Sequence, residues 1–578
     1  MPYIPFPSIG KLASLYILTY WFVLYYAQDY GRGDSGMRED GAGRFGRGAS
    51  IMVASVFISK LLGLLVVVPL QNIIGGYAYG IFRIAYPLYT IMLTLATIGF
   101  PLALSKTISQ LSAAGKHREA YANFRAIGRF MLIFGAIAFL LMWFGAPLYL
   151  TVTLPHDSRS LIIAAIPAIH TLAPALLLLP LISIERGYLQ GYLRLEASGA
   201  SQVVDQVARV TFILIGTVIA ALMGVNASTK AAIATFGATV GVLGAFLLLR
   251  VSVRKLRKET LRKSKFSPYT PPRAQDVFRQ LFVYALPIAT GTLVLPLAQA
   301  IDAWTIPRLL VASGATMVKA ITDYGIYTGE ALILMQLPLS FANAIGASIM
   351  PALTESRAAG VPHAVRARLN ASLKMMAFIT FPAALTLGLL AKQINIALFA
   401  SSSGTVAIAI AGIMSIFSAL ELVSTYILQG YDRFYRPVVH MFVGLAIKLA
   451  LNILLIPFFG INGAAIASTI GYLISAWLNM RAVRHFSGAR VQFPKIAWRA
   501  LAACLFVGAW FLLWQKGIAI LQVWQPQLAS MRIVALLEVL VALFVGAPIY
   551  LFFALRFRAV SGSELSKLPL VGKLLIRT

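Results

Sequence analysis

The stretch Ser50–Lys106 reads SIMVASVFISKLLGLLVVVPLQNIIGGYAYGIFRIAYPLYTIMLTLATIGFPLALSK and contains two long apolar runs, Ile51–Leu70 and Ile84–Leu104. Each run is close to the ~20 residues that a helix needs to cross the hydrocarbon core of a membrane. A short glycine-rich turn, Gly75–Gly80, joins the two runs. The stretch therefore predicts a pair of membrane-spanning helices.

One charged side chain, Lys60, lies inside the first apolar run and follows Ser59 directly. A charge at the centre of a membrane-spanning helix costs about 2.5–3.5 kcal/mol on insertion scales, so it normally faces a partner or a water-filled cavity. Two interpretations stay open. Either Lys60 faces a pathway through the membrane, or its long side chain reaches the membrane surface or a structural partner.

The composition is that of a membrane protein. Of the 578 residues, 59% are hydrophobic and 12% are charged, with a mean hydropathy of +0.82. Soluble domains carry about 25% charged residues. The net charge of +30 does not indicate a nucleic-acid partner, because Lys and Arg collect in the cytoplasmic loops of membrane proteins. Cys504 is the single cysteine, which excludes an intrachain disulfide.

We predict an all-α polytopic membrane protein, because the apolar runs have helical length and none shows the ten-residue alternation of a barrel strand. A further apolar segment, Leu12–Ala27, would make an extra N-terminal helix. We expect Met1–Gly36 to be dispensable, with Met37 as an alternative start. The fourteen predicted spans lie at approximately 50–73, 82–106, 127–150, 161–183, 201–224, 230–250, 278–303, 330–353, 369–391, 404–427, 437–458, 462–484, 497–521 and 531–556.

Lys and Arg concentrate in the even-numbered loops and in the C-terminal tail, whereas the odd-numbered loops hold scattered cations such as Arg159, Lys230 and Lys392. By the positive-inside rule the even-numbered loops are cytoplasmic. The sequence therefore predicts a multi-pass protein with a cytoplasmic C-terminus.

The chain also repeats itself. Span 4 closes with Tyr188-Leu-Gln-Gly-Tyr192 and span 10 closes with Ile427-Leu-Gln-Gly-Tyr431. Six spans per repeat is an even number, so two pseudo-symmetric six-helix lobes would share one orientation in the membrane. The predicted parts are an N-terminal extension with a Gly-rich linker (1–48), an N-lobe (49–250), a basic cytoplasmic linker (251–277), a C-lobe (278–485), and a C-terminal helix pair with a basic tail (486–578).

Three short motifs, together with the two Leu-Gln-Gly-Tyr closures, resemble those of a known family. They are Ser59-Lys60-Leu61-Leu62-Gly63, Ala85-Tyr86-Pro87-Leu88-Tyr89 and the segment Gly99–Lys106. In this order, and with two spans after the repeat, the chain resembles the stage V sporulation protein B and lipid II flippase branch of the multidrug/oligosaccharidyl-lipid/polysaccharide exporter superfamily. The resemblance implies a two-lobed exporter that moves a lipid-linked sugar precursor across the bacterial plasma membrane.

Such a cargo carries a pyrophosphate, and a dense anion crosses hydrocarbon only where cations and water compensate its charge. Members of this branch usually carry a second basic residue shortly after the Ser-Lys pair, where this chain has Val66 and Val67. The predicted substrate-binding residues, which would line a cationic cavity, are Lys60, Arg83, Ser59 and Lys448. Arg83 could supply the missing charge, or it could be an interfacial anchor.

Carboxylates inside the spans are candidates for binding a coupling ion, H⁺ or Na⁺: Glu421, Glu330 and Asp205. Asp205 lies four residues before Arg209, hence on the same helix face, and the two could simply neutralise each other. The sequence holds neither GxxxxGK[ST] nor HExxH, and its histidines are scattered. We therefore expect no catalytic residues, metal site or cofactor.

Three functions stay open. The first is a flippase for a lipid-linked oligosaccharide or peptidoglycan precursor, working by alternating access in polysaccharide, cell-wall or spore-cortex biosynthesis. The second is a cation-coupled multidrug or small-molecule exporter of the same superfamily. The third is a membrane scaffold that transports nothing. The two spans after the repeat favour the first, because the drug exporters typically stop at twelve.

Overall fold

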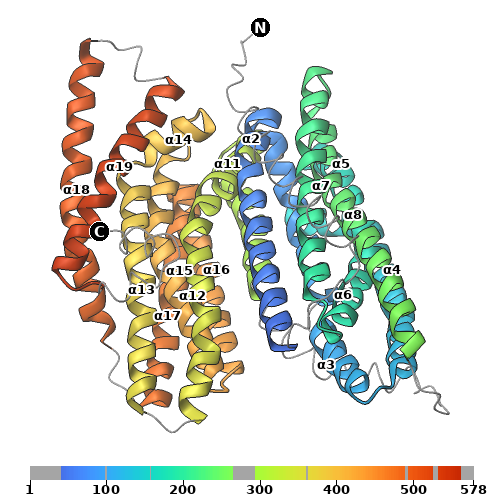
Figure 1. Cartoon of the computed structure of the whole chain (residues 1–578). Coiled ribbons are helices and arrows are strands. Elements are labelled where there is room, and N and C mark those ends of the chain that lie inside the picture. The colour runs from blue at the N-terminus through green and yellow to red at the C-terminus, as the bar shows by residue number, and fades with distance from the viewer. Residues whose placement is uncertain are drawn as a thin grey trace. The chain divides into compact units, whose positions relative to one another are not determined.

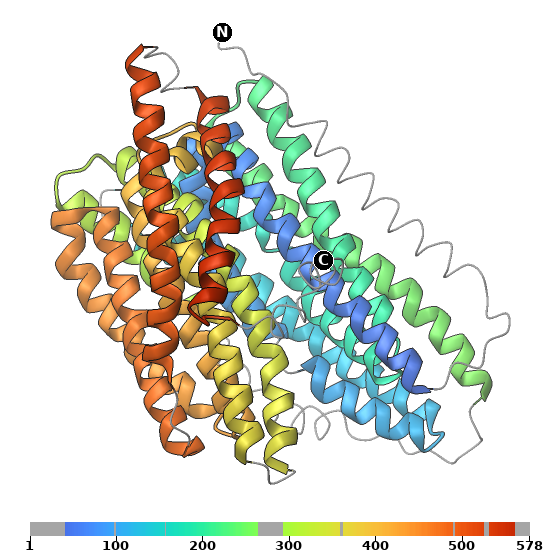
Figure 2. The same cartoon turned by 60° about the vertical axis from the view of Figure 1, so that its left-hand side comes forward.

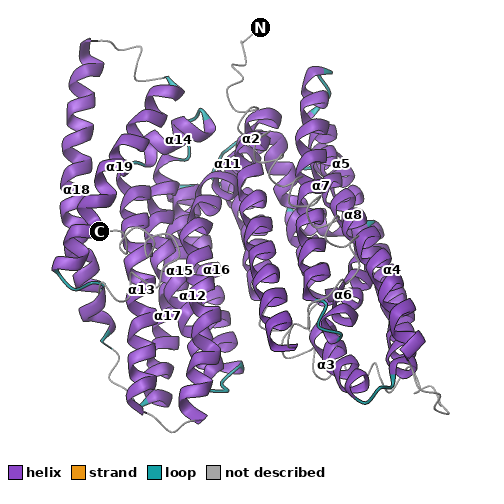
Figure 3. Cartoon of the chain, in the orientation of Figure 1, coloured by secondary structure: helices purple, strands orange, loops and turns teal. Residues whose placement is uncertain are grey.

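The computed structural model describes residues 41–97, 100–155, 158–263, 293–358, 362–488, 492–524 and 531–560. Within these ranges every regular element is a helix (Figure 3). In this described part of the chain, thirteen helical stretches are long and apolar enough to cross a membrane. The prediction of an all-α polytopic membrane protein is confirmed.

In chain order, the helices fall into three series. The first series is α2 (Gly41–Thr97), α3 (Phe100–Ala113), α4 (His117–Thr153), α5 (Arg159–Leu172), α6 (Ala175–Gly191), α7 (Leu195–Leu222) and α8 (Ala227–Lys263). The second is α10 (Val294–Ala312), α11 (Met317–Ile326), the π-helical turn η1 (Tyr327–Ala331), α12 (Leu332–Ala358), α13 (Pro362–Leu389), α14 (Ala391–Phe399), α15 (Thr405–Gly430), α16 (Tyr435–Phe459) and α17 (Ile461–Ser487). The last two are α18 (Phe493–Trp524) and α19 (Arg532–Arg556).

The first two predicted spans, 50–73 and 82–106, follow each other within α2 and are not separated by a loop; the second continues into α3. Only Gly75 interrupts α2, with φ 82° and ψ 161°. This region of backbone space is essentially restricted to glycine, because a Cβ would clash with the adjacent peptide groups. The glycine-rich turn of the sequence is thus reduced to one residue.

Several helices extend beyond the apolar runs that predicted them. Residues 41–48, assigned to the Gly-rich linker, are the first turns of α2. The predicted basic linker 251–277 begins inside α8, which reaches Lys263. Helical hydrogen bonding continues into polar sequence once a helix is nucleated, whereas the apolar run marks only the hydrocarbon-depth part. The rest of the linker, residues 1–40, most of the span 278–303 and the tail from 561 onward lie outside the described residues.

The described residues divide into two compact units. One comprises residues 41–66, 89–146 and 166–263, and the other comprises 67–88, 147–165 and the described residues from 293 to 560. The middle of α2 therefore belongs to the second unit, although both of its ends belong to the first. We describe each unit by itself.

The same helix pairings occur in both units. In the first, α6 packs against α3 and α8, and α7 packs against α8. In the second, α15 packs against α12 and α17, and α16 packs against α17. In terms of the predicted spans these are pairs 2–4, 4–6 and 5–6 of the first repeat and pairs 8–10, 10–12 and 11–12 of the second.

The two Leu-Gln-Gly-Tyr closures fold alike. Tyr192 caps α6 with φ −94° and ψ 12°, and Tyr431 caps α15 with φ −97° and ψ 14°. The next residue has positive φ in both cases, 59° at Leu193 and 60° at Asp432. Each tyrosine N–H donates to the carbonyl groups of the Leu and Gln before it. The two helix ends therefore have the same backbone geometry, as expected where a sequence motif is repeated.

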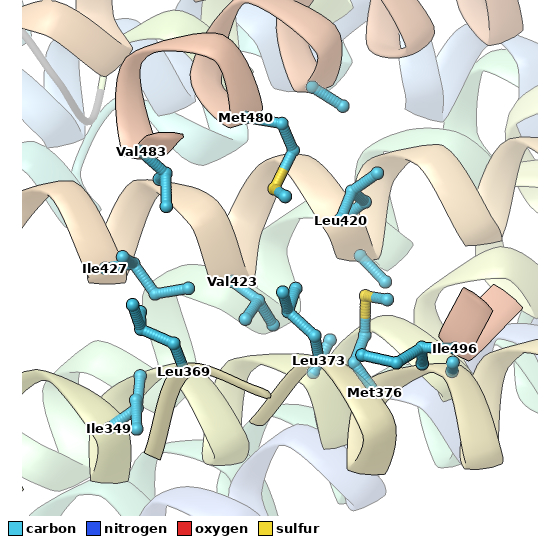
Figure 4. Packing of buried hydrophobic residues seen from close by; sticks show 14 of the residues in the cluster. Ile349, Leu369, Leu373, Met376, Leu420, Val423, Ile427, Met480, Val483 and Ile496 are labelled. Carbon is cyan, nitrogen blue, oxygen red and sulfur yellow. The ribbon is translucent and has the colours of Figure 1, made fainter. Parts of the chain in front are cut away.

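Apolar side chains fill the second unit between α12, α13, α15, α17 and α18 (Figure 4). Lipid tails are as apolar as these side chains, so the interior is held by close packing and by polar contacts rather than by a hydrophobic driving force. The labelled members of this cluster are Ile349, Leu369, Leu373, Met376, Leu420, Val423, Ile427, Met480, Val483 and Ile496.

The C-terminal helices α18 and α19 lie side by side in both views (Figures 1 and 2). Phe506 stacks on Phe553 with ring centroids 3.7 Å apart, which joins the two helices. Both helices belong to the second unit, where α13 contacts α18 and α14 contacts α19. The Tyr550 hydroxyl donates to the carbonyl of Phe378 at 2.9 Å. The helix pair that follows the sequence repeat is therefore anchored to α13 and α14.

Candidate functional site

Lys60 and Ser59 lie on α2 in the first unit, within the candidate span Ile58–Leu95. The Lys60 side chain is exposed, and among the described residues no carboxylate lies within ion-pair distance of it. The Ser59 hydroxyl oxygen is buried and forms no hydrogen bond within the described part of the chain. One face of this helix packs on α7, where Gly63 lies against the amide of Gln206.

Asp205 lies on α7 in the same unit and is paired within its own helix. Arg209 donates to Asp205 Oδ1 at 3.0 Å, and about a fifth of each side chain is exposed. Gly241 of α8 lies directly against this carboxylate, so a larger residue at that position would displace it. The four-residue spacing of the sequence thus becomes an ion pair held between two close helices.

Arg83 lies on the part of α2 that belongs to the second unit. Its side chain is half-buried, and its Nε is buried without a hydrogen-bond partner among the described residues. The guanidinium interacts electrostatically with the hydroxyls of Tyr79 and Tyr324 and with Asp302. Arg83 is therefore the cation of a partly buried polar region.

Lys448, on α16, is almost fully buried and is not a free cation. Its Nζ donates to Asp302 Oδ2 of α10 at 2.7 Å. Asn452, one turn further on, donates to Asp302 Oδ1 at 3.4 Å and to Thr305 Oγ1 at 2.8 Å. The charge of Lys448 is thus neutralised inside the unit by an aspartate that the sequence reasoning did not select.

Glu330 lies in the π-helical turn η1 and is only 1% exposed. Gln71 of α2 donates to Glu330 Oε1 at 2.7 Å. Asn395 of α14, with its amide turned so that both of its polar atoms find partners, donates to Oε2 at 3.0 Å. The carboxyl group therefore receives two neutral amide donors from two other helices.

Glu421, on α15, is the centre of a second neutral cluster. Thr425 donates to its Oε1 at 2.9 Å, and Asn479 of α17 donates to the same oxygen at 3.4 Å. His440 Nδ1 lies 2.7 Å from Asn479 Oδ1. Asn479 thus links the buried carboxyl group of Glu421 to the half-buried ring of His440.

The predicted site residues are divided between the two units. Lys60, Ser59 and Asp205 belong to one unit, and the other four belong to the second. In the second unit Arg83 and Lys448 both interact with Asp302, whereas Glu330 and Glu421 each have partners of their own. Asp302 was missed, although an acid in one apolar run and the isolated Lys448 in another are the signal of a buried ion pair. Gln71, Asn395 and Asn479 were missed because amides carry no charge that stands out in apolar sequence.

Arg308 lies beyond the predicted span 278–303, where the sequence suggests an exposed loop, but the structure places it in a helix. It lies within α10, and its guanidinium donates to the carbonyl groups at the end of α4, including those of Val152 at 2.6 Å and Leu154 at 2.8 Å. A cation at a helix C-terminus satisfies carbonyls that have no partner in the helix and complements the helix dipole. Its role is structural.

The arrangement supports ion and anion binding. In the described residues there is no group of three or more His, Cys, Asp or Glu that could hold a metal ion. What the two units offer is an exposed cation on α2, a partly buried cation among hydroxyls, and two buried carboxyls held by neutral donors. Groups of this kind inside membrane spans mark ion and substrate pathways.

The chain is similar to known membrane proteins over most of its length. The family model described as polysaccharide biosynthesis protein matches residues 45–357, more than half of the chain. Two relatives come from Bacillus subtilis (strain 168). One is the lipid II flippase MurJ, 28% identical over 88% of this chain and 95% of the relative. The other is stage V sporulation protein B, 24% identical over 92% of this chain and 99% of the relative.

Solved structures share the fold. A structure titled lipid II flippase MurJ, inward closed conformation, matches with a TM-score of 0.61 at 16% identity, over 88% of this chain and 98% of that chain. An inward-facing multidrug resistance MATE family transporter of the MOP superfamily matches with a TM-score of 0.60 at 14% identity, over 76% and 98%. These names agree with the prediction of a transporter rather than an enzyme. The protein is a multi-pass membrane transporter that belongs to the polysaccharide biosynthesis protein family.

Proposed function

We propose that the chain is a flippase that moves a lipid-linked, pyrophosphate-bearing sugar precursor across the bacterial plasma membrane. The observation that carries the proposal is Lys60, an exposed cation in a candidate span without a carboxylate partner among the described residues. The relative named as a lipid II flippase, aligned over 95% of its length, supports the cargo class. Transport would proceed by alternating access of the two six-helix lobes, with the C-terminus in the cytoplasm.

The cargo needs a counter-charge within the membrane. An unpaired charge in hydrocarbon is so costly that an anionic head group crosses only where cations and water replace its hydration. Lys60 would supply the first cation, and beside it lies the Ser59 hydroxyl, which has no hydrogen-bond partner among the described residues. Arg83 would supply a second, because its Nε has no hydrogen-bond partner in the described ranges. Lys448 is bound to Asp302 and would become available only if that ion pair opened.

An inside-negative membrane potential would assist this cargo. Moving one charge through 100 mV is worth about 2.3 kcal/mol, so the potential favours the outward movement of an anion. The carboxyl groups of Glu330 and Glu421 are held by neutral donors only, and a coupling ion could also bind at either of them. Asp205 is less suited to this role, because Arg209 already neutralises it.

A second candidate function is a cation-coupled multidrug or small-molecule exporter. The buried carboxyls Glu330 and Glu421, neither of which contacts a cation in the described residues, favour it. Against it stands the α18–α19 pair, which follows the sequence repeat and packs on α13 and α14. A scaffold without transport would not need an exposed lysine in a span.

Complementation tests the proposed cargo class. The chain should support growth of a strain depleted of its own peptidoglycan-precursor flippase. Lys60→Arg should retain most of this activity, Lys60→Ala should lose it, and Lys60→Glu should be at least as defective because it repels the phosphate. Lys392→Ala, which removes an exposed lysine of α14, is the matched control and should complement. Full complementation by Lys60→Glu at wild-type protein levels would show that Lys60 is not the partner of the anion.

A further inference from the structure

Glu330 lies at a junction of three segments of the second unit. It is part of the π-helical turn η1, its two donors come from α2 and α14, and the start of α15 touches it at Gly404. A π-helical turn inserts one residue into a helix and is frequent at functional sites. The carboxyl group thus connects the long helical stretch Met317–Arg357 to α2, α14 and the start of α15.

The orientation of Asn395 is set by the backbone. The N–H groups of Gly404 and Thr405 both point at one atom of its side chain, at 3.2 Å each, and a pair of donors requires the amide oxygen there. The amide nitrogen must therefore face Glu330 Oε2. Asn395 can donate to this carboxyl group but cannot accept from it.

Gln71 has the freedom that Asn395 lacks. Its nitrogen donates to Glu330 Oε1, and its own Oε1 is buried without a hydrogen-bond partner among the described residues. A buried acceptor left without a partner is costly, and native structures rarely keep one without a reason. If Glu330 carried a proton, inversion of the Gln71 amide would let the carboxylic acid donate to the oxygen that is now unpartnered.

The charges around Glu330 are few. On α2, the Tyr79 hydroxyl interacts electrostatically with both Glu330 and Arg83. On η1, the Tyr327 hydroxyl is hydrogen-bonded to the Ser468 hydroxyl at 2.9 Å. Lys392 of α14 is exposed, and Arg532 of α19 donates to the carbonyl groups of Ala397 and Leu398. Within the described residues no Lys, Arg or His contacts the carboxyl group, so its negative charge is uncompensated.

The site is too tight and too rich in donors for a metal ion. A Cβ on Gly404 would already collide with Glu330 Oε2, and both carboxyl oxygens receive N–H donors, which repel a cation. A proton needs no additional space. We propose that Glu330 is a proton-binding site. When the proton binds or leaves, the Gln71 amide inverts, and this changes the contacts of η1 with α2 and with the start of α15. As a coupling device the site rests on the proposed transport function, but proton binding itself does not.

The test uses the full-length purified chain and needs no cargo. Cys504, the only cysteine, is buried, so a Cys504→Ala background leaves a single reporter at Ser403→Cys, an exposed position next to Gly404. The rate of maleimide labelling, corrected for free cysteine at each pH, should change several-fold between mildly acidic and mildly alkaline solution. Glu330→Gln should abolish this dependence and hold the rate at its acidic value. Glu185→Gln is the matched control, because it replaces a buried carboxyl group of α6 that the proposed function does not use, and it should keep the dependence.

A second variant keeps the test decisive if Glu330→Gln does not fold. Asn395→Leu removes a donor that binds the carboxylate more strongly than the neutral acid, so the labelling transition should move to higher pH. A pH response unchanged in Glu330→Gln, a wild-type rate that does not vary with pH, or a rate that follows Na⁺ at constant pH would each overturn the proposal. The labelling experiment contains no lipid-linked precursor, so its outcome does not depend on transport. If the chain failed to flip a lipid-linked sugar, the proposed function would be contradicted, but the evidence for proton binding at Glu330 would stand.

Discussion

Lys448 and Asp302 show how single residues decide the interior of the second unit. Each is an isolated charge in an apolar segment, and their side chains meet at 2.7 Å with 7% and 3% exposed. Removing one member of a buried ion pair leaves an uncompensated charge, whereas replacing both by apolar groups is often tolerated.

We expect Asp302→Asn and Lys448→Met each to destabilise the folded protein, by about 3–5 kcal/mol. The double variant Asp302→Leu/Lys448→Met should lose less than the two single effects combined. Thermal unfolding of the detergent-solubilised protein measures this. Glu355→Gln, in the exposed pair with Arg368, is the control and should cost at most about 1 kcal/mol. Strict additivity would mean that the buried pair contributes nothing.

At this scale the sequence locates charges but not their partners. The isolated Lys60, Arg83, Lys448, Glu330 and Glu421 stand out in apolar sequence because burying a charge is costly. Which of them is paired depends on helix contacts across about 150 or 260 positions of sequence, as for Lys448 with Asp302 and Glu330 with Gln71. No local pattern encodes such contacts, and the amides of Gln71 and Asn395 give no signal at all.

Among the elements, α2 departs from regular helical geometry at one residue. Gly75 lies at φ 82° and ψ 161°, and a Cβ at this position would meet no atom within 4 Å. Space is therefore not the constraint. The constraint is the backbone conformation, which residues other than glycine adopt only under strain.

Gly75→Ala should therefore lower the stability of the protein, by about 1–3 kcal/mol. Gly517→Ala is the matched control, because Gly517 also has open space around it but lies inside the helix α18. That substitution should be neutral or slightly stabilising, since alanine favours helix over glycine by about 0.5–1 kcal/mol. Equal melting temperatures for the two variants would show that the bend in α2 does not depend on glycine.

The existence and type of nearly all elements could be predicted, because the length of an apolar run identifies a membrane-spanning helix. Their ends could not. The apolar run 330–353 corresponds to α12, but the helical stretch begins at Met317 and includes the π-helical turn at Glu330. An inserted residue in a helix leaves the composition unchanged, so a pattern of apolar residues does not reveal it.

For the whole molecule, the loop charges predict a cytoplasmic C-terminus. A fluorescent protein fused after Thr578 should fluoresce, and alkaline phosphatase inserted after Val225, in an odd-numbered loop between α7 and α8, should be active. The reversed pair of results would invert the membrane orientation and with it the direction of transport that we propose.

The repeated helix pairings and the matching ends of α6 and α15 agree with two related lobes. That the lobes superpose, with α6 on α15 about an axis along the membrane normal, stays a prediction. An experimental structure in which α6 and α15 run in opposite directions across the membrane would contradict it.

Translocation by the purified protein tests the central claim most directly. The chain would be reconstituted in liposomes with a fluorescent lipid-linked pyrophosphate sugar, and reduction of the dye in the outer leaflet would report the leaflet occupied. We predict that the wild-type chain moves this lipid and that Lys60→Arg retains the movement. Lys60→Glu should abolish it, and a lipid with an uncharged sugar head should not be moved. Equal rates for wild type and Lys60→Glu, or for the charged and uncharged lipids, would contradict the account.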